Sequence, residues 1–367
     1  MFHVVRPGAI AAAVCLAPAG TALADITADD VWSNSSALIE ALGGRQQANL
    51  QRDGERITVR DHRGDFALPM GAGLISFAIS DYSMTEEAGE VVVTYPPEME
   101  IRLGLSIPGE GDASMTLRMG DAAISTFAAG DPGAISYVTR TGPISMGLAE
   151  LSVPWEADLA AEFEIGIDSY VAETRIVEDS LIVVFSRSEV GRSTTSSVFR
   201  DLQGFETTTM AETGPSTNTF NMGLIPGGAD LLNLSAALRD GMYITAESSA
   251  ERTMSRTRTS IDGAMTQEQF YEIERASGSF ALDRAQLAFG FDVGPGIFEM
   301  AQEFMTPPAF GIDFQGLRLD MAGPILQSGE PQPFRLGFGL EDLRLGPTIW
   351  ALFDPEKALP RGPASTN

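Results

Sequence analysis

The chain has almost no cysteine, histidine or lysine. Its 367 residues contain one cysteine, two histidines and a single lysine, Lys357. The cysteine, Cys15, lies in an N-terminal segment that we expect to be removed, so the mature chain forms no disulfide and carries no thiolate. The sequence lacks the zinc, EF-hand, serine-elbow and dinucleotide motifs His-Glu-x-x-His, Asp-x-Asp-x-Asp-Gly, Gly-x-Ser-x-Gly and Gly-x-Gly-x-x-Gly. We therefore predict no catalytic residue, no metal site and no cofactor.

Long apolar runs are also missing. The longest, residues 9–19, is broken by Pro18 and falls far short of the ~20 apolar residues that cross a bilayer. Arg6 precedes this run, and Ala22 and Ala24 place small residues where a signal peptidase cuts. The sequence predicts a signal peptide over residues 1–24, a mature chain starting at Asp25, export to the periplasm, and no transmembrane span after cleavage.

Positive charge is scarce. The chain has 24 basic and 50 acidic residues, and removal of the signal peptide takes away Arg6 and changes the formal charge from −26 to −27. A field of that sign repels phosphate backbones, so we expect no nucleic-acid partner. The many carboxylates leave a glycan-directed hydrolase open as a third possibility, because two of them within ~5–10 Å of each other are expected by chance.

The periodicity predicts one N-terminal helix followed by strands. Thr27 caps the helix with Asp30 three residues on, Val31, Trp32 and Leu38 form its apolar side, and two glycines end it. The 38 glycines and 21 prolines then divide short period-two stretches, which are typical of strands. Alternating apolar residues are clearest at residues 99–107, 163–167 and 287–291.

These patterns predict a mainly β fold, a curved antiparallel sheet that is elongated or two-lobed, with the helix packed on it. The expected segments are a signal peptide (1–24), the N-terminal helix (25–44), a first β region (45–203), a linker and short helix (204–240), a second β region (241–346), and a helical turn with a C-terminal tail (347–367). Residues 204–230 are poor in charge, and a long hairpin with an exposed tip is the alternative to a linker there. A short helix is expected at 229–239 and a helical turn at 348–353.

A strand pattern, apolar-x-apolar-x-x-apolar-x-apolar, recurs five times around a central pair that is usually polar. A two-residue step in a period-two strand shifts its phase, as a β-bulge does, and bends the strand while the apolar set keeps facing one core. Five such strands would form a curved or rolled sheet; chance recurrence in a β-rich chain is the alternative. The central pairs are Ser80-Asp81, Ala149-Glu150, Asp283-Arg284, Gln315-Gly316 and Glu341-Asp342.

Two polar features are candidate functional sites. His62 lies among charged residues in Arg-Asp-His-Arg-Gly-Asp, and we expect a solvated loop residue. Strand alternation places Arg252, Arg256 and Arg258 on one face, where they form a positive stripe able to hold an anionic ligand. The alternative is an exposed strand whose arginines pair with Glu247, Glu251 or a neighbouring strand.

The C-terminal segment carries a resemblance. Pro333-Phe334-Arg335-Leu336, then Leu343-Arg344-Leu345, Ile349-Trp350-Ala351-Leu352-Phe353-Asp354-Pro355 and Leu359-Pro360-Arg361-Gly362-Pro363 follow one another. Together with the signal and the opening helix, this resembles the domain-of-unknown-function family numbered 2125, found in alphaproteobacterial envelopes. The resemblance implies location and β architecture and carries no activity or functional residues. Longer members continue with further strands, so we expect any function of that extension to be missing here.

The function expected from the sequence is non-catalytic. The first hypothesis is a periplasmic protein that holds an apolar or amphipathic envelope molecule, such as a lipid, in a β groove, by analogy with envelope lipid-handling proteins. The second is a structural or partner-binding envelope protein without ligand. A groove open to solvent favours the first hypothesis, and a filled core favours the second.

Overall fold

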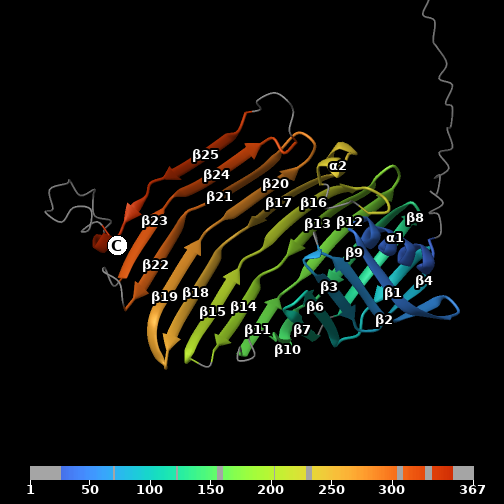
Figure 1. Cartoon of the computed structure of the whole chain (residues 1–367), viewed down its shortest axis with the longest axis horizontal. Helices are drawn as coiled ribbons and strands as arrows, with labels where there is room; N and C mark the ends of the chain where they lie inside the picture. Colours follow the sequence, from blue (N-terminus) through green and yellow to red (C-terminus); the bar gives the residue numbers. More distant parts are fainter. Residues whose placement is uncertain are drawn as a thin grey trace, which may run out of the picture.

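The computed structural model describes residues 26–68, 71–120, 123–154, 160–201, 203–228, 234–303, 309–326 and 333–349. The predicted signal peptide lies outside these residues. Within them the chain forms one helix, α1 (Ala28–Ala41), and then one large open antiparallel sheet, interrupted once by the short helix α2 (Leu234–Arg239). Figure 1 shows the sheet from its N-terminal part (blue) to its C-terminal part (red). The mainly β fold with an N-terminal helix is therefore confirmed.

The strands lie in two rows that meet along the middle of the sheet. The first row contains, in order, β1 (Gly44–Asp53), β2 (Arg56–Ala67), β3 (Leu74–Ile79), β6 (Met99–Ile107), β7 (Gly111–Gly120), β10 (Ile144–Ser152), β11 (Ala160–Ile167), β14 (Ser193–Arg200), β15 (Phe205–Thr213), β18 (Thr253–Ile261), β19 (Ala264–Ile273), β22 (Gly296–Gln302), β23 (Ala309–Phe314) and β26 (Arg344–Leu345). The second row begins at the same β2 and continues through β4 (Tyr82–Glu87), β5 (Glu90–Thr94), β8 (Ile124–Asp131), β9 (Ala134–Thr141), β12 (Tyr170–Glu178), β13 (Ile182–Val190), β16 (Ser216–Leu224), β17 (Tyr243–Ala250), β20 (Ala276–Leu282), β21 (Leu287–Val293), β24 (Gly316–Gly323) and β25 (Arg335–Glu341).

Successive strands cross from one row to the other through short links, most of them two residues long. The hydrogen-bond ladder continues across these links: Asp168 N–H donates to the Arg192 carbonyl (2.9 Å) and Gly191 N–H donates to the Ser169 carbonyl (2.8 Å). In Figure 1 the linked segments, such as β19 and β20, follow one another as one long strand. At a two-residue link the inward-facing set changes between odd and even residue numbers, and it therefore stays on one face of the sheet.

The repeated pattern marks these links in three of its five copies. Ser80-Asp81 is the link between β3 and β4, Gln315-Gly316 contains the one-residue link from β23 and the first residue of β24, and Glu341-Asp342 contains the last residue of β25 and the start of the link to β26. The copy at Ala149-Glu150 falls on a register shift within β10. The prediction is wrong at Asp283-Arg284, which forms the hairpin turn between β20 and β21. A polar pair between apolar pairs is equally suited to a turn, so the pattern alone does not separate the two cases.

Helix α1 forms as the sequence predicts. The Thr27 hydroxyl accepts from Asp30 N–H, and the Asp30 carboxylate accepts from Thr27 N–H, so the capping box is complete. Val31 and Trp32 pack on a core that includes Ile57, Met84 and other residues of β2, β4, β5, β8 and β9. Leu38 and Ala41 pack on a second core formed by β12, β13 and β16. The helix therefore covers the N-terminal part of one sheet face.

Three segments of the chain were expected to be a linker, a short helix and a C-terminal helical turn, and the structure corrects the first of these. The segment expected as a linker is not one, because β15 and β16 pair along nearly their whole length with neighbours on both sides. These neighbours are β14 and β18 for β15, and β13 and β17 for β16. Its Thr, Ser and Asn residues alternate along a pleated surface and so remain compatible with strands. The short helix is confirmed as α2. The C-terminal helical turn begins at Pro347, and residues beyond 349 lie outside the described part.

Candidate binding trough

The sheet has two chemically different faces. We define the inner face as the one that carries α1, and we follow it across the strands by register, because side chains alternate between faces along a strand. It passes from Val184 in β13 through Met222 in β16 and Ile244 in β17 to Leu282 in β20, each directly opposite the next. The outer face carries the residues between these positions.

The inner face is apolar over the C-terminal strands, and we call this region the apolar zone. Its residues are Tyr271, Ile273, Phe280, Leu282, Leu287, Phe289, Phe291, Val293, Phe298, Met300, Phe310, Ile312, Phe314, Leu317, Leu319, Met321, Leu336, Phe338, Leu340 and Leu345. Leu282 and Val293 are buried, but many of the other side chains are incompletely covered: Phe291 is 42% exposed, Leu336 65% and Phe338 68%. An exposed contiguous apolar surface of this extent is typical of a binding site rather than of a free solvent-facing surface.

The inner face of the central strands carries hydroxyl and amide side chains, and we call this region the hydroxyl zone. It consists of Ser186, Ser188, Ser193, Thr195, Ser197, Thr207, Thr209, Thr213, Ser216, Asn218, Ser248, Thr253, Ser255, Thr257 and Thr259. Pairs of these residues meet across strands, as Thr209 and Thr257 do with 3.1 Å between their hydroxyl oxygens. Directly opposite one another across successive strands lie Ser197, Thr209, Thr257, Gln269, Met300 and Phe310. Along this line, which we call a rung, the inner face changes from hydroxyl through amide to apolar side chains.

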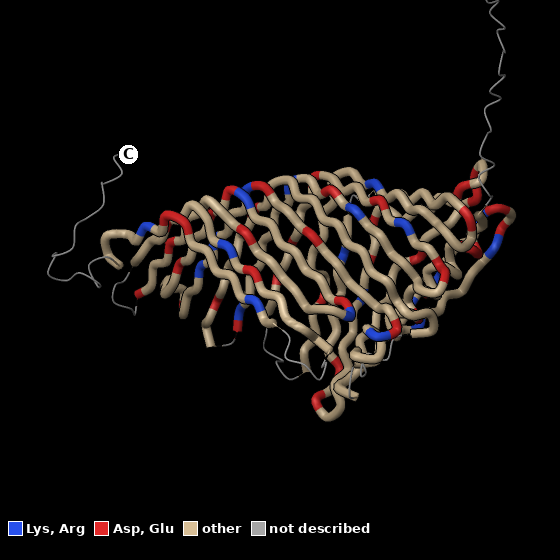
Figure 2. Tube along the Cα trace, turned by 90° about the horizontal axis from the view of Figure 1, so that it is seen from above, with Lys and Arg blue, Asp and Glu red and all other residues tan. Residues whose placement is uncertain are grey.

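Charge is confined to the outer face in this region. Between β13 and β26, no described inner-face strand position holds Asp, Glu, Lys or Arg. The ion pairs of the same strands use outer-face carboxylates, for example Arg187–Glu189 at 3.2 Å and Arg318–Asp320 at 2.6 Å. Figure 2 shows both signs of charge interspersed along the strands of the arched sheet. The outer face is therefore the solvated face.

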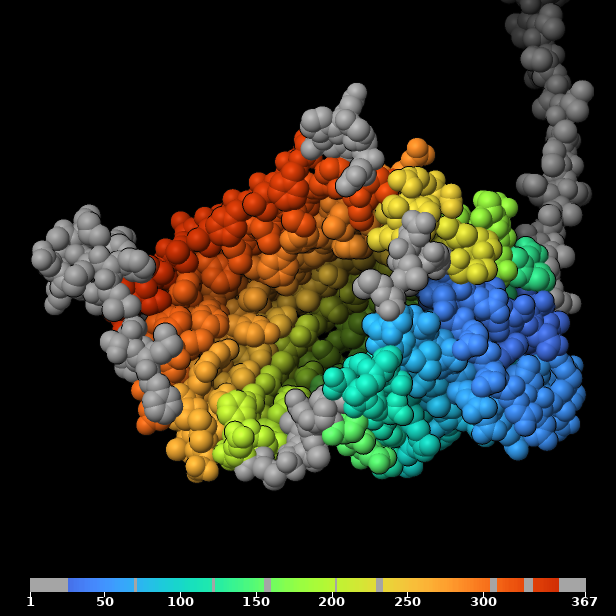
Figure 3. Space-filling model, in the orientation of Figure 1, coloured from blue at the N-terminus to red at the C-terminus, as the bar shows by residue number. Residues whose placement is uncertain are grey.

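The inner face lines a visible hollow. Figure 3 shows the C-terminal strands (olive to red) as its rear wall, with the N-terminal strands (cyan to teal) in front. The N-terminal wall is apolar as well, because the alternating residues predicted from the sequence over 99–107, including Leu103 and Leu105, lie opposite Phe77 and Ile75 of β3. Towards the N-terminus the hollow is closed by α1 and its two cores. We call the whole hollow the trough.

The arginine stripe lies on the outer face, opposite the trough. Arg252 lies 2.6 Å from Glu272, and Arg256 and Arg258 lie 3.7 and 2.9 Å from Glu268, all on the neighbouring strand β19. The Arg256 guanidinium also lies over the Phe270 ring, 5.3 Å from its centroid. The hydrogen bond to Glu272 raises the pKa of Arg252 above its ordinary value. This geometry fits the second interpretation of the stripe, in which the arginines pair with carboxylates of a neighbouring strand.

His62 is not the loop residue that the sequence indicated. It lies within β2, is 6% exposed, and packs edge-on against Trp32 and Phe77 with ring centroids 5.2 and 5.5 Å away. Its Nε2 lies 3.1 Å from Gln46 Oε1 and its Nδ1 lies 3.3 Å from the Tyr82 hydroxyl. Burial lowers the pKa of His62 below its usual value. The residue fills the position where β2 changes partner from β4 to β3.

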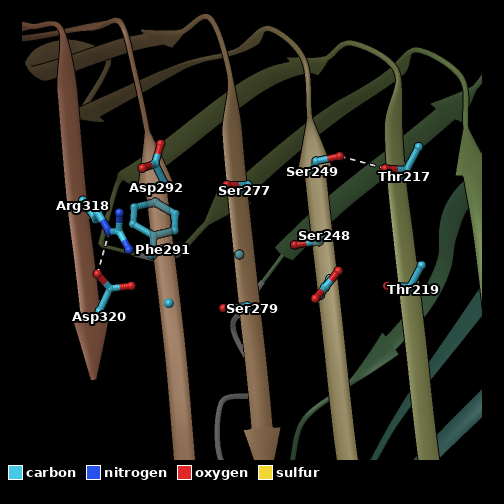
Figure 4. Close-up of a pocket in the computed structure, with 13 residues that line it drawn as sticks. Thr217, Thr219, Ser248, Ser249, Ser277, Ser279, Phe291, Asp292, Arg318 and Asp320 are labelled. Carbon is cyan, nitrogen blue, oxygen red and sulfur yellow. Dashed lines mark hydrogen bonds and ion pairs between the residues drawn. The ribbon is translucent and has the colours of Figure 1, made fainter. Parts of the chain in front are cut away.

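The outer face has a shallow depression of about 500 Å³ where hydroxyl side chains of β16, β17 and β20 meet charged side chains of β17, β21 and β24. Figure 4 shows Thr217 hydrogen-bonded to Ser249 and Arg318 paired with Asp320 within it. The arginine is already engaged by a carboxylate, and the other side chains are mostly hydroxyls. We find no nucleophile activated by a neighbouring base among the described residues of this depression.

No group of three or more metal-ligating side chains occurs in the described part of the chain. No helix there is both long and apolar enough to cross a membrane. No protein-family model, curated protein or solved structure matches this chain.

Sequence reasoning singled out the arginine stripe and missed the trough residues, although a signal for them was present. The stretches with the clearest alternation, at residues 99–107, 163–167 and 287–291, all lie on the inner face. Their pattern shows which side chains share a face. Whether another layer covers that face depends on strands and helices far away in the sequence.

Proposed function

We propose that this chain is a non-catalytic protein of the periplasm that holds a lipid on the inner face of its trough. Export rests on the predicted signal peptide. Identification of the mature N-terminus at Asp25 by mass spectrometry tests this placement; a periplasmic chain that still starts at Met1 contradicts it.

The observation that carries the proposal is the uncharged, exposed apolar zone. Phe280, Phe291 and Phe338 are 37–68% exposed on the same sheet face whose N-terminal part is buried under α1. Burial of apolar surface stabilises a complex by about 25 cal/mol per Å², so acyl chains along this face would gain free energy from each ring they cover.

Acyl chains fit this surface better than a charged polymer or a protein segment. A charged polymer needs counter-charges, and the inner face from β13 to β26 offers none in its described strand positions. Protein interfaces have an apolar centre surrounded by a polar, solvent-accessible rim. Here the apolar zone instead passes into uncharged hydroxyls along one trough. This two-part surface matches an amphiphile that has chains at one end and a neutral polar part at the other.

A matched pair of variants tests the face that binds. Phe291 on the inner face and Phe185 on the outer face are the same residue type with similar exposure, 42% and 48%. N-phenyl-1-naphthylamine, an uncharged probe that fluoresces in apolar surroundings, should bind the wild type and Phe185→Glu alike. Phe291→Glu should reduce binding at least tenfold, because it places a carboxylate among apolar side chains.

Equal loss in both variants, or no probe binding by the folded wild type, overturns the proposal. Native mass spectrometry of the chain purified from its own periplasm should show a bound mass in the range of a lipid. A bound peptide in place of a lipid also overturns it.

One observation favours a second function, the binding of a partner protein. Strand β25 pairs with β24 on one side, and no described strand pairs with its other side. Its inner-face side chains Leu336 and Phe338 are among the most exposed apolar residues. An unpaired apolar edge of this kind is a template for strand addition. Light scattering of the wild type and of Leu336→Asp tests it: an assembly that this change dissociates supports partner binding.

A further inference from the structure

The trough has a polar subsite within it. The hydroxyl zone lies beside the apolar zone on the same face, and the two are joined rung by rung through the register of β14, β15, β18, β19 and β22. A trough that held only hydrocarbon would gain nothing from these hydroxyls, because their lost hydrogen bonds to water would not be replaced.

The hydroxyls keep free hydrogen-bonding capacity. Thr209 and Thr257 lie 3.1 Å apart, and Thr207 and Thr259 lie 3.4 Å apart. In each pair one hydroxyl donates to the other, so one proton and several lone pairs remain for a third group. Both pairs are half-buried on the inner face, where that third group would enter from the trough.

Ser255 gives a second, independent indication. It is only 6% exposed, lies on the inner face between Ala211 and Tyr271, and forms no side-chain hydrogen bond with any described residue. Its hydroxyl oxygen is not among the described side-chain atoms that are both fully buried and unpartnered, so it stays open to the trough at the boundary between the two zones, where a ligand group can supply a hydrogen bond.

We infer that the hydroxyl zone binds an uncharged, hydroxyl-bearing headgroup, such as a sugar, of a lipid whose chains lie on the apolar zone. This inference rests on the proposed function and specifies its ligand class. A sugar headgroup offers both donors and acceptors, as the threonine pairs do. A phosphate would need cations near the hydroxyl zone. Among the described residues from β13 to β26, the arginines in strands lie on the outer face, and others lie in the links between strands.

Three detergents with the same 12-carbon chain test the headgroup: dodecyl maltoside, dodecylphosphocholine and dodecyl phosphate, each below its critical micelle concentration. Binding to the wild-type mature chain is measured by calorimetry, with free maltose as a fourth probe. Dodecyl maltoside should bind at least tenfold more tightly than dodecyl phosphate. Free maltose should show no measurable binding, because it cannot cover the apolar zone.

The double variant Thr209→Val and Thr257→Val removes two inner-face hydroxyls at nearly constant shape and keeps residues that strands favour. It should weaken dodecyl maltoside binding about tenfold and leave dodecyl phosphate unchanged. The matched control is Thr217→Val with Ser249→Ala, a hydroxyl pair on the outer face with 2.7 Å between its oxygens. This control should bind all probes as the wild type does.

The outcomes separate this inference from the proposed function. If the three detergents bind alike and the double variant changes nothing, the headgroup inference is wrong while the lipid trough stands. If free maltose binds as tightly as dodecyl maltoside, the site is a sugar site and both are wrong. If no detergent binds the folded chain, both are wrong. If dodecyl phosphate binds most tightly, the headgroup inference is wrong and an anionic ligand is indicated.

Discussion

The Tyr137 hydroxyl donates a 2.7 Å hydrogen bond to the side-chain oxygen of Asn34, and this contact fixes α1 on the inner face. Asn34 is 1% exposed, although it lies on a helix, and its amide also donates to the Glu178 carboxylate at the end of β12. Burial raises the pKa of Tyr137 well above its usual value, so the phenol keeps its proton at neutral pH. The helix that closes one end of the trough is therefore positioned by a polar contact as well as by its apolar side chains.

Replacement of Asn34 by alanine should lower the free energy of unfolding by about 2 kcal/mol. It leaves the half-buried Tyr137 hydroxyl without its acceptor, and unmade buried hydrogen bonds cost about 1–3 kcal/mol. Urea unfolding measures the change. Ser33→Ala, at the neighbouring exposed helix position, is the control and should change the free energy by no more than a few tenths of a kcal/mol. Equal effects of the two changes would show that the contact adds no stability.

The environment of His62 predicts a pH dependence of stability. Because burial lowers its pKa in the native chain, the unfolded chain binds a proton at about pH 6.5 that the native chain does not. The contribution of neutral His62 to the free energy of unfolding is fully present above about pH 6.5. It is lost progressively as the pH falls from about 6.5 towards the lowered pKa of the native chain. The urea concentration at the midpoint of unfolding of the wild type should therefore decrease as the pH is lowered from 7.5 to 5.5.

The control for this prediction is His62→Gln, which cannot titrate in this range and can still bond to its neighbours. Its unfolding midpoint should depend less on pH than that of the wild type. The unfolding midpoints of the wild type and of His62→Gln should converge as the pH falls. The reason is that only the wild type loses the stabilisation that neutral His62 provides. Parallel curves would show that other groups cause the pH dependence.

His62 also shows where sequence reasoning ends. Its neighbours Asp61 and Arg63 are charged, which suggested a solvated position. In a strand, however, adjacent side chains point to opposite faces, so charged neighbours carry no information about the residue between them. Only some bends of the sheet could be predicted, because a two-residue polar step in an alternating strand is a local signal that a hairpin turn, as at Asp283-Arg284, also gives. The exposure of the apolar zone could not, since alternation is the same on a covered and an uncovered face.

The arginine stripe yields a prediction of little change. Replacement of Arg252, Arg256 and Arg258 by glutamine should lower the unfolding midpoint only slightly, because exposed ion pairs contribute little to stability. It should leave dodecyl maltoside binding unchanged, because the three side chains pair with Glu272 and Glu268 on the face opposite the trough. Calorimetry and thermal unfolding on the same samples check both statements. Loss of a co-purified ligand from the triple variant would instead support the anion-binding hypothesis.

The links that bend the strands depend on close backbone packing, and Gly294 tests this. It lies between β21 and β22 with φ +153°, and a Cβ there would lie 2.3 Å from the carbonyl oxygen of Gln315 in the adjacent link. Gly294→Ala should therefore destabilise the chain by at least about 2 kcal/mol, from backbone strain and from the separation of the two links.

Gly263 provides the control for this last prediction. It also has a positive φ, +79°, but lies in the hairpin turn between β18 and β19, where a Cβ would meet nothing within 4 Å. Gly263→Ala should thus cost only the conformational term, about 1–2 kcal/mol. Urea unfolding of both variants separates backbone strain from packing. If Gly294→Ala costs no more than the control, adjacent links are not in tight contact, and the bends would have to be set by the inner-face side chains instead.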